Sequence, residues 1–518
     1  MNVASGSTRH PEIGDLPALR LELVDDRPPR AEGDYVVYWM TAARRLRWNF
    51  ALDRAVAWAE ELQRPLVIVE VIGCGGRWDC DRFHRFLLQG AGNHVCQARD
   101  FPVRYYPYLE RKPGAGRRFL TELGRRACVV VTDNYPIRLP SVDTLPAELP
   151  CRCEKIDGNG LLPIRAADRA FPTAYAFRRM LQRVLPEHML AAPQADPLDS
   201  VRLPALGELP EQLTRRWPPV SFERSERELA KLPIEHGVPP APPEGGSGAA
   251  VARWRGFLNH QLPAYPDRRN QPEADGSSRL SPYLHFGHIS THEVFHDLAR
   301  EEDWNPTLLA DKATGARAGW WGMSEWAEAF LDQFITWREL GFNGCTFLPH
   351  YDRYTSLPDW ARATLAQHAA DPRPYVYSPA EFDAAQTHDP LWNAAQTQLR
   401  TQGVIHNYLR MLWGKKILEW TSHPEEALEI MIDLNNRYAL DGQDPNSYSG
   451  IFWILGRYDR AWGPKRPIFG TVRFMSSANT ARKYRVRNYI QEHSADPRLD
   501  SEETAGDGCG TVGERLDP

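Results

Sequence analysis

The feature that most constrains the fold is a change of periodicity midway along the 518-residue chain. In the first 200 residues, apolar runs such as YVVYWM (35–40), PLVIVEVI (65–72) and CVVVTDNYP (128–136) alternate with segments of helical spacing. After residue 250, apolar residues recur every three or four positions, as in WAEAFLDQFITWREL. The first pattern predicts a parallel sheet with helices on both faces, and the second predicts an all-α domain.

Composition marks the predicted borders of these domains. Residues 1–33 are polar and Pro-rich, and residues 491–518 are acidic, so we expect both ends to be poorly ordered. Residues 201–250 end in GVPPAPPEGGSGAA, which is typical of a linker with only short helical pieces. The α/β domain is therefore predicted over residues 34–200 and the helical domain over residues 251–490.

Several classes of protein are disfavoured. No apolar run is long enough to cross a membrane, and the N-terminus lacks the hydrophobic segment of a signal peptide. The eight cysteines are scattered, and Cys151 and Cys153 are too close for a CxxC pair, so we expect no metal site and a reducing cytoplasm. In GCGGRW (73–78), Trp78 replaces the third glycine of GxGxxG, which argues against a dinucleotide fold.

Charge is unevenly distributed along a chain whose net charge is −5. Residues 457–487 hold nine Lys or Arg against one acid, Asp459, and Trp453, Trp462 and Phe474 lie within or beside this segment. Basic and aromatic side chains in one segment suit a phosphate backbone with exposed bases. A solvated surface of salt bridges is the alternative.

Three of the seventeen tryptophans form a spaced set. Trp413 and Trp420 are seven residues apart on one predicted helix, so they share a face and lie about 10 Å apart along its axis. Trp392 lies just before that helix or on the preceding one. Indoles at such spacing could pass an electron from a buried redox centre to the surface. Ordinary core packing explains the spacing alone more simply.

Longer motifs resemble those of class II cyclobutane pyrimidine dimer photolyases. HDPLWNAAQ, LRMLWGKKILEW, LNNRYALDGQDPNSYSGIFW and FGTVRFM follow one another in that family's order within residues 387–489. SSRLSPYLHFGHIS (277–290) resembles the flavin-cradling segment of the wider photolyase and cryptochrome family, and YVVYWMTAARRLRWNFALDRAVAWA resembles the class II opening motif. The resemblance covers residues 34–491.

The resemblance implies light-driven repair of pyrimidine dimers in UV-damaged double-stranded DNA, by electron transfer from photoexcited reduced FAD to a flipped-out dimer. It implies a monomer, cytoplasmic or nucleoid-associated, with an FAD-binding helical domain. The resemblance also implies a possible second, antenna chromophore: a deazaflavin, a folate or a flavin. The motif IDGNGLLPI (156–164) would lie below the site of this chromophore. By the same resemblance, the flavin-binding residues are Tyr265, Arg269, Asn270, Ser277, Ser278, Arg279, Leu280, Ser281, Arg410, Asp441, Asp444 and Asn446.

The resemblance also assigns the residues of catalysis and substrate binding. Asn435 would face flavin N5, and Trp392, Trp413 and Trp420 would form the electron relay. Trp337 and Trp453 would flank the dimer, and Met411 would lie beneath it. Arg473 would enter the gap that the flipped dimer leaves in the duplex.

Two departures from the family pattern keep other functions open. Gln333 stands where the family has a carboxylate, and ILGRYDRAW is one residue short and lacks the histidine before Asp459, which blurs Asp459 as a partner of Arg269. A cryptochrome-like photoreceptor with little or no repair activity would fit Gln333 and the acidic tail. A nucleotide-binding enzyme that works without light and a non-catalytic DNA-binding protein are weaker alternatives. The intact dimer-pocket residues favour repair.

Overall fold

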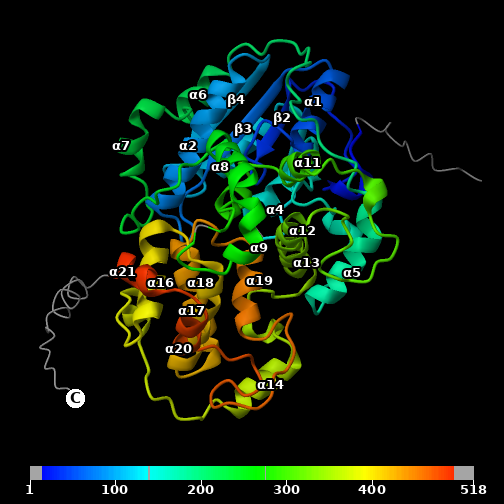
Figure 1. Ribbon diagram of the computed structural model, residues 1–518. Coiled ribbons are helices and arrows are strands. Elements are labelled where there is room, and N and C mark those ends of the chain that lie inside the picture. Colours follow the sequence, from blue (N-terminus) through cyan, green and yellow to red (C-terminus); the bar gives the residue numbers. More distant parts are fainter. Residues whose placement is uncertain (1–14, 138–139, 275, 495–518) are drawn as a thin grey trace, which may run out of the picture.

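The structure is a computed structural model that describes residues 15–137, 140–274 and 276–494 (Figure 1). Its N-terminal part is a six-stranded sheet with helices on both faces, and its C-terminal part is helical, which confirms the predicted fold class. The tail from residue 495 onward, like residues 1–14, lies outside the described ranges. The strands are β1 (Leu21–Leu23), β2 (Tyr35–Met40), β3 (Leu66–Ile72), β4 (Val103–Leu109), β5 (Ala127–Asp133) and β6 (Arg152–Ile156).

The helices of the sheet domain and linker are α1 (Phe50–Glu61), α2 (Asp81–Ala98), α3 (Ala115–Gly124), α4 (Pro140–Glu148), α5 (Ala174–Val184), α6 (Glu211–Arg216) and α7 (Ser225–Leu229). A π-helix, Asp332–Trp337, joins α12 to α13. The remaining helices are α8 (Ser247–His260), α9 (Tyr265–Arg268), α10 (Ser281–His285), α11 (Thr291–Glu301), α12 (Glu325–Leu331), α13 (Arg338–Phe347), α14 (Asp359–Gln367), α15 (Pro379–Asp383), α16 (Pro390–Gln402), α17 (Asn407–Trp420), α18 (Pro424–Tyr438), α19 (Pro445–Ile454), α20 (Ser477–Lys483) and α21 (Arg487–Glu492).

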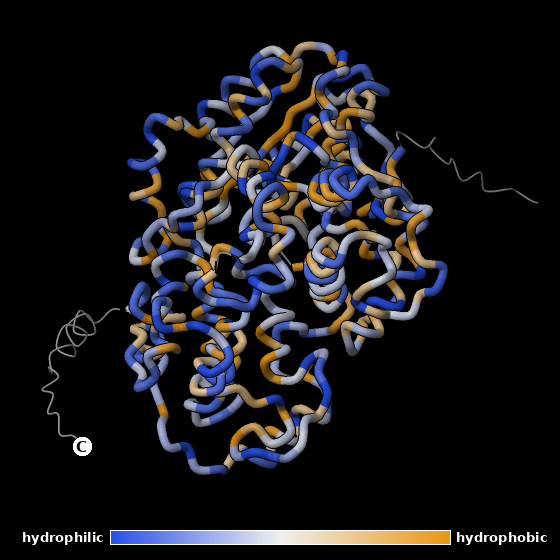
Figure 2. The backbone as a smooth tube through the Cα atoms, in the orientation of Figure 1, coloured by the Kyte–Doolittle hydropathy of each residue, from blue (hydrophilic) through white to orange (hydrophobic). Residues whose placement is uncertain are grey.

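The sheet has the strand order β1-β6-β5-β2-β3-β4, and all neighbours are parallel except β1 and β6. Its central strands are almost wholly apolar because helices cover both faces. Alternate residues of β2 join different cores, with Tyr38 packed in the same cluster as Trp58 of α1, and Trp39 in that of Phe119 of α3. In Figure 2 hydrophobic stretches run through the interior, while the outer turns are mostly hydrophilic.

Two of the predicted boundaries need correction. Strand β1 lies within residues 1–33, so the expectation of poor order is wrong for this strand, which pairs with the otherwise open edge of β6. The predicted linker, residues 201–250, is packed onto the sheet, because Leu213 and Trp217 belong to one of its apolar cores. No helix within the described ranges combines the length and the apolar character needed to cross a bilayer.

Candidate functional site

The loops that follow β5 and β6 contact the helical domain. After β5, the hydroxyl of Tyr135 donates a hydrogen bond to Asp444 Oδ2 at 2.9 Å. After β6, the backbone N–H groups of Leu161 and Leu162 donate to the Glu339 carboxylate on α13, at 2.7 and 3.2 Å. These bonds hold the helical domain against the carboxyl edge of the sheet.

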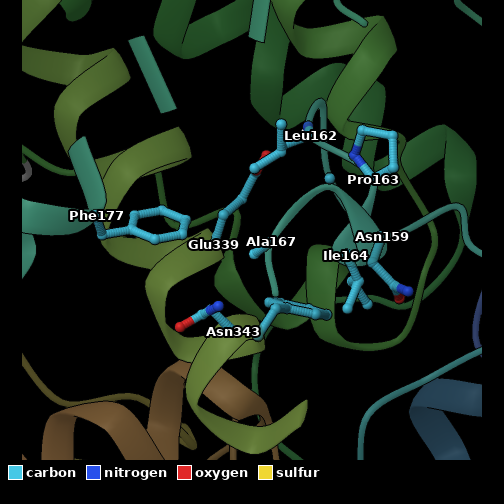
Figure 3. Close-up of a pocket in the computed structure, with 10 residues that line it drawn as sticks. Asn159, Leu162, Pro163, Ile164, Ala167, Phe177, Glu339 and Asn343 are labelled. Atoms are coloured by element: carbon cyan, nitrogen blue, oxygen red, sulfur yellow. Dashed lines mark hydrogen bonds between the residues drawn. The ribbon is translucent and has the colours of Figure 1, made fainter. Parts of the chain in front are cut away.

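The IDGNGLLPI segment therefore forms part of a domain contact. Figure 3 shows a small cavity beside it, with Glu339 and Asn343 of α13 on one side and Asn159 to Ile164 on the other. Burial raises the pKa of Glu339 to about 7, although Arg338 and the two N–H donors act in the opposite direction. The segment fixes one wall of the helical domain whether or not a second chromophore binds nearby.

The serine loop before α10 is held in one conformation by Arg253 of α8. Arg253 Nε donates to the carbonyl of Ser278 at 2.9 Å, and a second guanidinium nitrogen donates to that of Ser277 at 3.0 Å. Arg279 has φ +53°, and a Cβ at Gly276 would come within 2.5 Å of the Arg268 backbone. Such an anchored polar turn, with a backbone shape that few residues adopt, is suited to binding phosphate oxygens.

A half-buried ion pair forms another part of the predicted flavin site. A terminal nitrogen of Arg410, on α17, contacts both carboxylate oxygens of Asp441 at 2.9 and 3.3 Å. Arg410 Nε is buried and has no hydrogen-bond partner among the described residues. Leaving such a donor unsatisfied costs about 1–3 kcal/mol, so the geometry suits a ligand that supplies an acceptor. Asn435 is also buried, and its Nδ2 donates to Ser447 Oγ at 2.6 Å.

His406 connects these two parts of the site. It precedes α17, and its ring lies close to the backbone of Arg269 and to Arg279. Burial lowers the pKa of His406 to about 4, so the imidazole is neutral at neutral pH. The Arg269 guanidinium lies 5.6 Å from the centre of the Tyr265 ring. Three segments far apart in sequence, which the family resemblance assigns to flavin binding, thus meet in space.

Asp444 has a structural task in addition to its predicted one. Its Oδ1 accepts from the Asn446 N–H at 2.8 Å, which caps α19, and its Oδ2 meets both Tyr135 and His285. Burial opposes its charge, but His285 and the N–H donor keep the pKa of Asp444 below its ordinary value. Of the other predicted residues, Leu280 is buried, Asn270 is half-buried, and Ser281 and Asn446 are exposed.

The three relay tryptophans form one buried group. Trp392 lies on α16, and Trp413 and Trp420 lie on α17; they are 1, 1 and 2 % exposed. Trp392 Nε1 donates to the carbonyl of Trp413 at 3.0 Å, and the Trp392 and Trp420 rings are 6.0 Å apart. Trp413 Nε1 donates to Gln396 Oε1 at 2.9 Å. Trp392 therefore lies between the other two, and Trp420 is itself buried.

Two of the predicted dimer-pocket residues contact each other: the Trp337 and Trp453 rings are 5.7 Å apart and tilted by 51°. Gln333 and Trp337 lie in the π-helix, a form often found at functional sites. Gln333 Nε2 lies 3.4 Å from Asp332 Oδ2, and Arg178 pairs with the other oxygen of that carboxylate at 2.7 Å.

The basic segment lies on the outside of the helical domain. Eight of its nine cations are exposed, whereas Arg457 is buried against Phe452. Trp462 is 36 % exposed, donates to Asp459 Oδ1 at 3.0 Å, and is stacked by Arg473 and by Arg460, both exposed. Asp459 thus holds the tryptophan in place, and no bond to Arg269 is seen among the described residues.

Sequence reasoning missed the residues that position the site. Ser447, Gln396 and His285 contact predicted site residues from other elements and occur in motifs quoted above without having been assigned a role. Arg253, which holds the backbone of the serine loop, lies outside every quoted motif. Their roles depend on contacts across the fold, so spacing along the chain gave no signal. Within the described ranges no three His, Cys, Asp or Glu side chains gather as metal ligands would.

Comparison with known proteins gives relatives along most of the chain. A deoxyribodipyrimidine photo-lyase of Methanothermobacter thermautotrophicus is 33% identical over 477 residues, which are 91% of this chain and 97% of that protein. One from Arabidopsis thaliana is 32% identical and covers 88% of each chain. No family model matched the chain.

A solved structure supports the same fold. The bacterial class III photolyase of Agrobacterium tumefaciens superimposes with a TM-score of 0.60 at 16% identity, covering 89% of this chain and 86% of that one. A sequence identity of 16% supports the fold alone. The curated relatives, at 33% and 32% identity, are similar enough in sequence to define the family. The chain belongs to the deoxyribodipyrimidine photo-lyase family.

Proposed function

We propose that this protein uses light to repair cyclobutane pyrimidine dimers in UV-damaged DNA, with FAD as its catalytic cofactor. The observation that carries the proposal is the order of residues on α17. Arg410, Met411 and Trp413 lie within about one helical turn, so a flavin held at Arg410 would be next to both the dimer pocket and the tryptophan relay.

The residues described above would bind FAD in a consistent way. The loop held by Arg253 would contact the diphosphate, Arg410 with Asp441 would contact the flavin ring, and Asn435 would meet flavin N5. Bound reduced FAD would absorb light and supply the electron. The protein would bind and orient the cofactor, keep water away from it and support its negative charge with Arg410.

The direct test is dimer removal under light. We expect purified protein to release non-covalent FAD after heat or acid, and the reduced protein to remove dimers from irradiated DNA under blue light but not in the dark. A colourless protein that cannot be reconstituted with FAD would contradict the proposal, and so would a flavoprotein without light-dependent repair.

The photoreceptor function is the alternative. Gln333 favours it, because a photoreceptor has no need for a carboxyl group in the dimer pocket. Repair is better supported, because Trp337 and Trp453 contact each other, Met411 reaches Gly450 on the same helix as Trp453, and the curated relatives named above are photo-lyases.

Gln333→Glu should raise the repair yield. A protonated carboxyl can donate a hydrogen bond, and a proton, to a thymine carbonyl that gains negative charge, whereas an amide can donate only the hydrogen bond. We expect about a two- to tenfold higher yield, equivalent to about 0.4–1.4 kcal/mol. Dimers removed per absorbed photon measure it.

Dimer affinity is the control for this variant, and we expect it to change little. Asp332, whose carboxylate pairs with Arg178, offers a matched position, and Asp332→Asn should not raise the yield. If the wild type repairs nothing and Gln333→Glu restores nothing, the photoreceptor function takes the place of repair.

Arg473→Ala should weaken binding to duplex DNA that contains a dimer more than binding to a dimer in a single strand. The exposed guanidinium, stacked on Trp462, would fill the gap that a flipped dimer leaves, and a single strand has no such gap. A loss of about 1–3 kcal/mol is expected on duplex. Arg482→Ala, an exposed cation on α20, is the control: it should weaken both substrates equally. Equal losses for Arg473→Ala would make Arg473 a phosphate contact.

A second chromophore would fit best at the carboxyl edge of the sheet. The chain runs from β2 outward to β3 and β4 and then returns to β5 and β6 on the other side, so β2 and β5 flank the point where strand order reverses. Ligands of open parallel sheets bind at such points. A pocket lies there, lined in part by Ala42 and Ala43 after β2, by Asp133 at the end of β5 and by Asn134 after it.

A further inference from the structure

Trp420 is only 2 % exposed, so the tryptophan relay ends inside the protein. Two aromatic rings lie between it and the solvent: the half-buried Tyr377 ring is 5.7 Å from Trp420 and the exposed His388 ring is 4.9 Å away. Farther out, Tyr375 is 47 % exposed and stacks on His388 at 3.7 Å. A continuous set of rings therefore runs from Trp420 to the surface.

The hydroxyl of Tyr377 has a fixed partner for its proton. It lies 2.6 Å from His388 Nδ1, and the His388 backbone N–H donates to the same phenol oxygen at 3.0 Å. We assign the phenol O–H as the donor of this hydrogen bond, because a neutral histidine with its proton on Nε2 leaves Nδ1 free to accept. Nδ1 is then the acceptor, and the neutral ring carries its proton on Nε2.

We propose that Tyr377 is the last electron donor of the relay and that His388 accepts its proton. This rests on the proposed function, in which bound FAD would supply a light-driven oxidant. Trp413 would lose an electron and regain one from Trp420 by way of Trp392, so that Trp420 is left oxidised. Tyr377 then gives one electron to Trp420 and its phenolic proton to His388 Nδ1. The indole of Trp420 is restored, and a neutral tyrosyl radical and an imidazolium remain.

The hydrogen bond makes this step favourable. A phenol that loses an electron becomes a strong acid, so a base already in place lowers the free energy of its oxidation. Phe382 also packs near Trp420, with ring centres 6.5 Å apart, but it has no ionisable proton. The exposure of His388 lets the proton leave to water, which separates the two charges and slows their recombination.

Time-resolved absorption and electron paramagnetic resonance of the FAD-loaded protein after a light flash test the proposal. In the wild type, a tryptophan radical should decay as a tyrosyl radical rises, more slowly in D₂O. In Tyr377→Phe the tryptophan radical should form at the same rate but recombine. The yield of reduced flavin per flash should fall about tenfold, equivalent to about 1.4 kcal/mol.

Two further variants complete the test. His388→Phe keeps an aromatic ring at an exposed position, where folding is not at risk, and should lower the tyrosyl yield because the base is gone. Tyr375→Phe keeps the stacked ring and should leave the tyrosyl radical unchanged. An unchanged tryptophan-radical decay in Tyr377→Phe, or an unchanged tyrosyl yield in His388→Phe, would overturn the inference. A wild type that forms no tryptophan radical would instead refute the relay in the proposed function.

Discussion

Trp413→Phe is expected to abolish photoreduction of the oxidised flavin while leaving repair by chemically reduced enzyme nearly intact. Trp413 is three residues from Arg410 on α17 and contacts Trp392, so it is the entry to the buried tryptophan group. Phenylalanine is much harder to oxidise than tryptophan. We expect photoreduction to slow at least about 100-fold, equivalent to about 2.7 kcal/mol. Repair returns its electron to the flavin and does not need the relay.

The absorbance of oxidised flavin under blue light, with an external reductant, measures the effect. Trp254→Phe is the matched control, because Trp254 is equally buried and also uses its indole N–H, as a donor to Asp297 Oδ2 at 3.1 Å, yet lies outside the relay. Both variants lose the hydrogen bond of a buried indole, so both should be destabilised by about 1–3 kcal/mol. Photoreduction that is equally fast in both would show that another route carries the electron.

Glu154→Ala should have the largest effect on stability. The Glu154 side chain is fully buried in β6 and accepts hydrogen bonds from Arg54, from Arg152 and from Trp58 Nε1, at distances from 2.7 to 3.1 Å. Its removal takes a carboxylate away from two buried guanidinium groups. A loss of about 3–5 kcal/mol is expected when one partner of a buried ion pair is deleted.

The denaturation midpoint in urea tests this, with Glu148→Ala as the control. Glu148 pairs with Arg117 at an exposed site, where a loss of no more than about 1 kcal/mol is expected. Burial would raise the pKa of Glu154, but Arg54, Trp58 and Arg152 together hold it below its ordinary value of 4.5. The stabilisation from this charge should therefore persist at neutral pH and be lost only as the pH falls through that lowered value. Similar losses for the two variants would argue against a buried ion cluster.

Sequence reasoning identified the elements whose signal is local. Alternating apolar runs predicted β2, β3 and β5, because a strand covered on both faces is apolar almost throughout. It did not predict β1, since three residues have no measurable period and this strand forms only because β6 offers an open edge. Likewise, a linker rich in Pro and Gly gave no sign that Trp217 would pack onto the sheet.

The candidate site divides in the same way. Trp413 and Trp420 were placed on one helix by their spacing, and the motifs named the flavin residues. Spacing did not reveal that Trp392 sits between the two, that Trp420 is buried, or that Trp337 and Trp453 touch. Those features depend on how α16, α17, α19 and the π-helix pack against one another, which no single helix encodes.

By itself the sequence thus determined the fold class, the family and the chemical type of most site residues, because periodicity and motif order are properties of the chain. Tertiary structure decided which side chains meet. Packing brings Arg253 within hydrogen-bond distance of the serine loop and places His388 beside Tyr377. It also buries Arg457, although the other cations of the basic segment are exposed. The physical reason is that hydrogen bonds and ring contacts act over a few ångströms, and packing alone brings residues distant in sequence within that range.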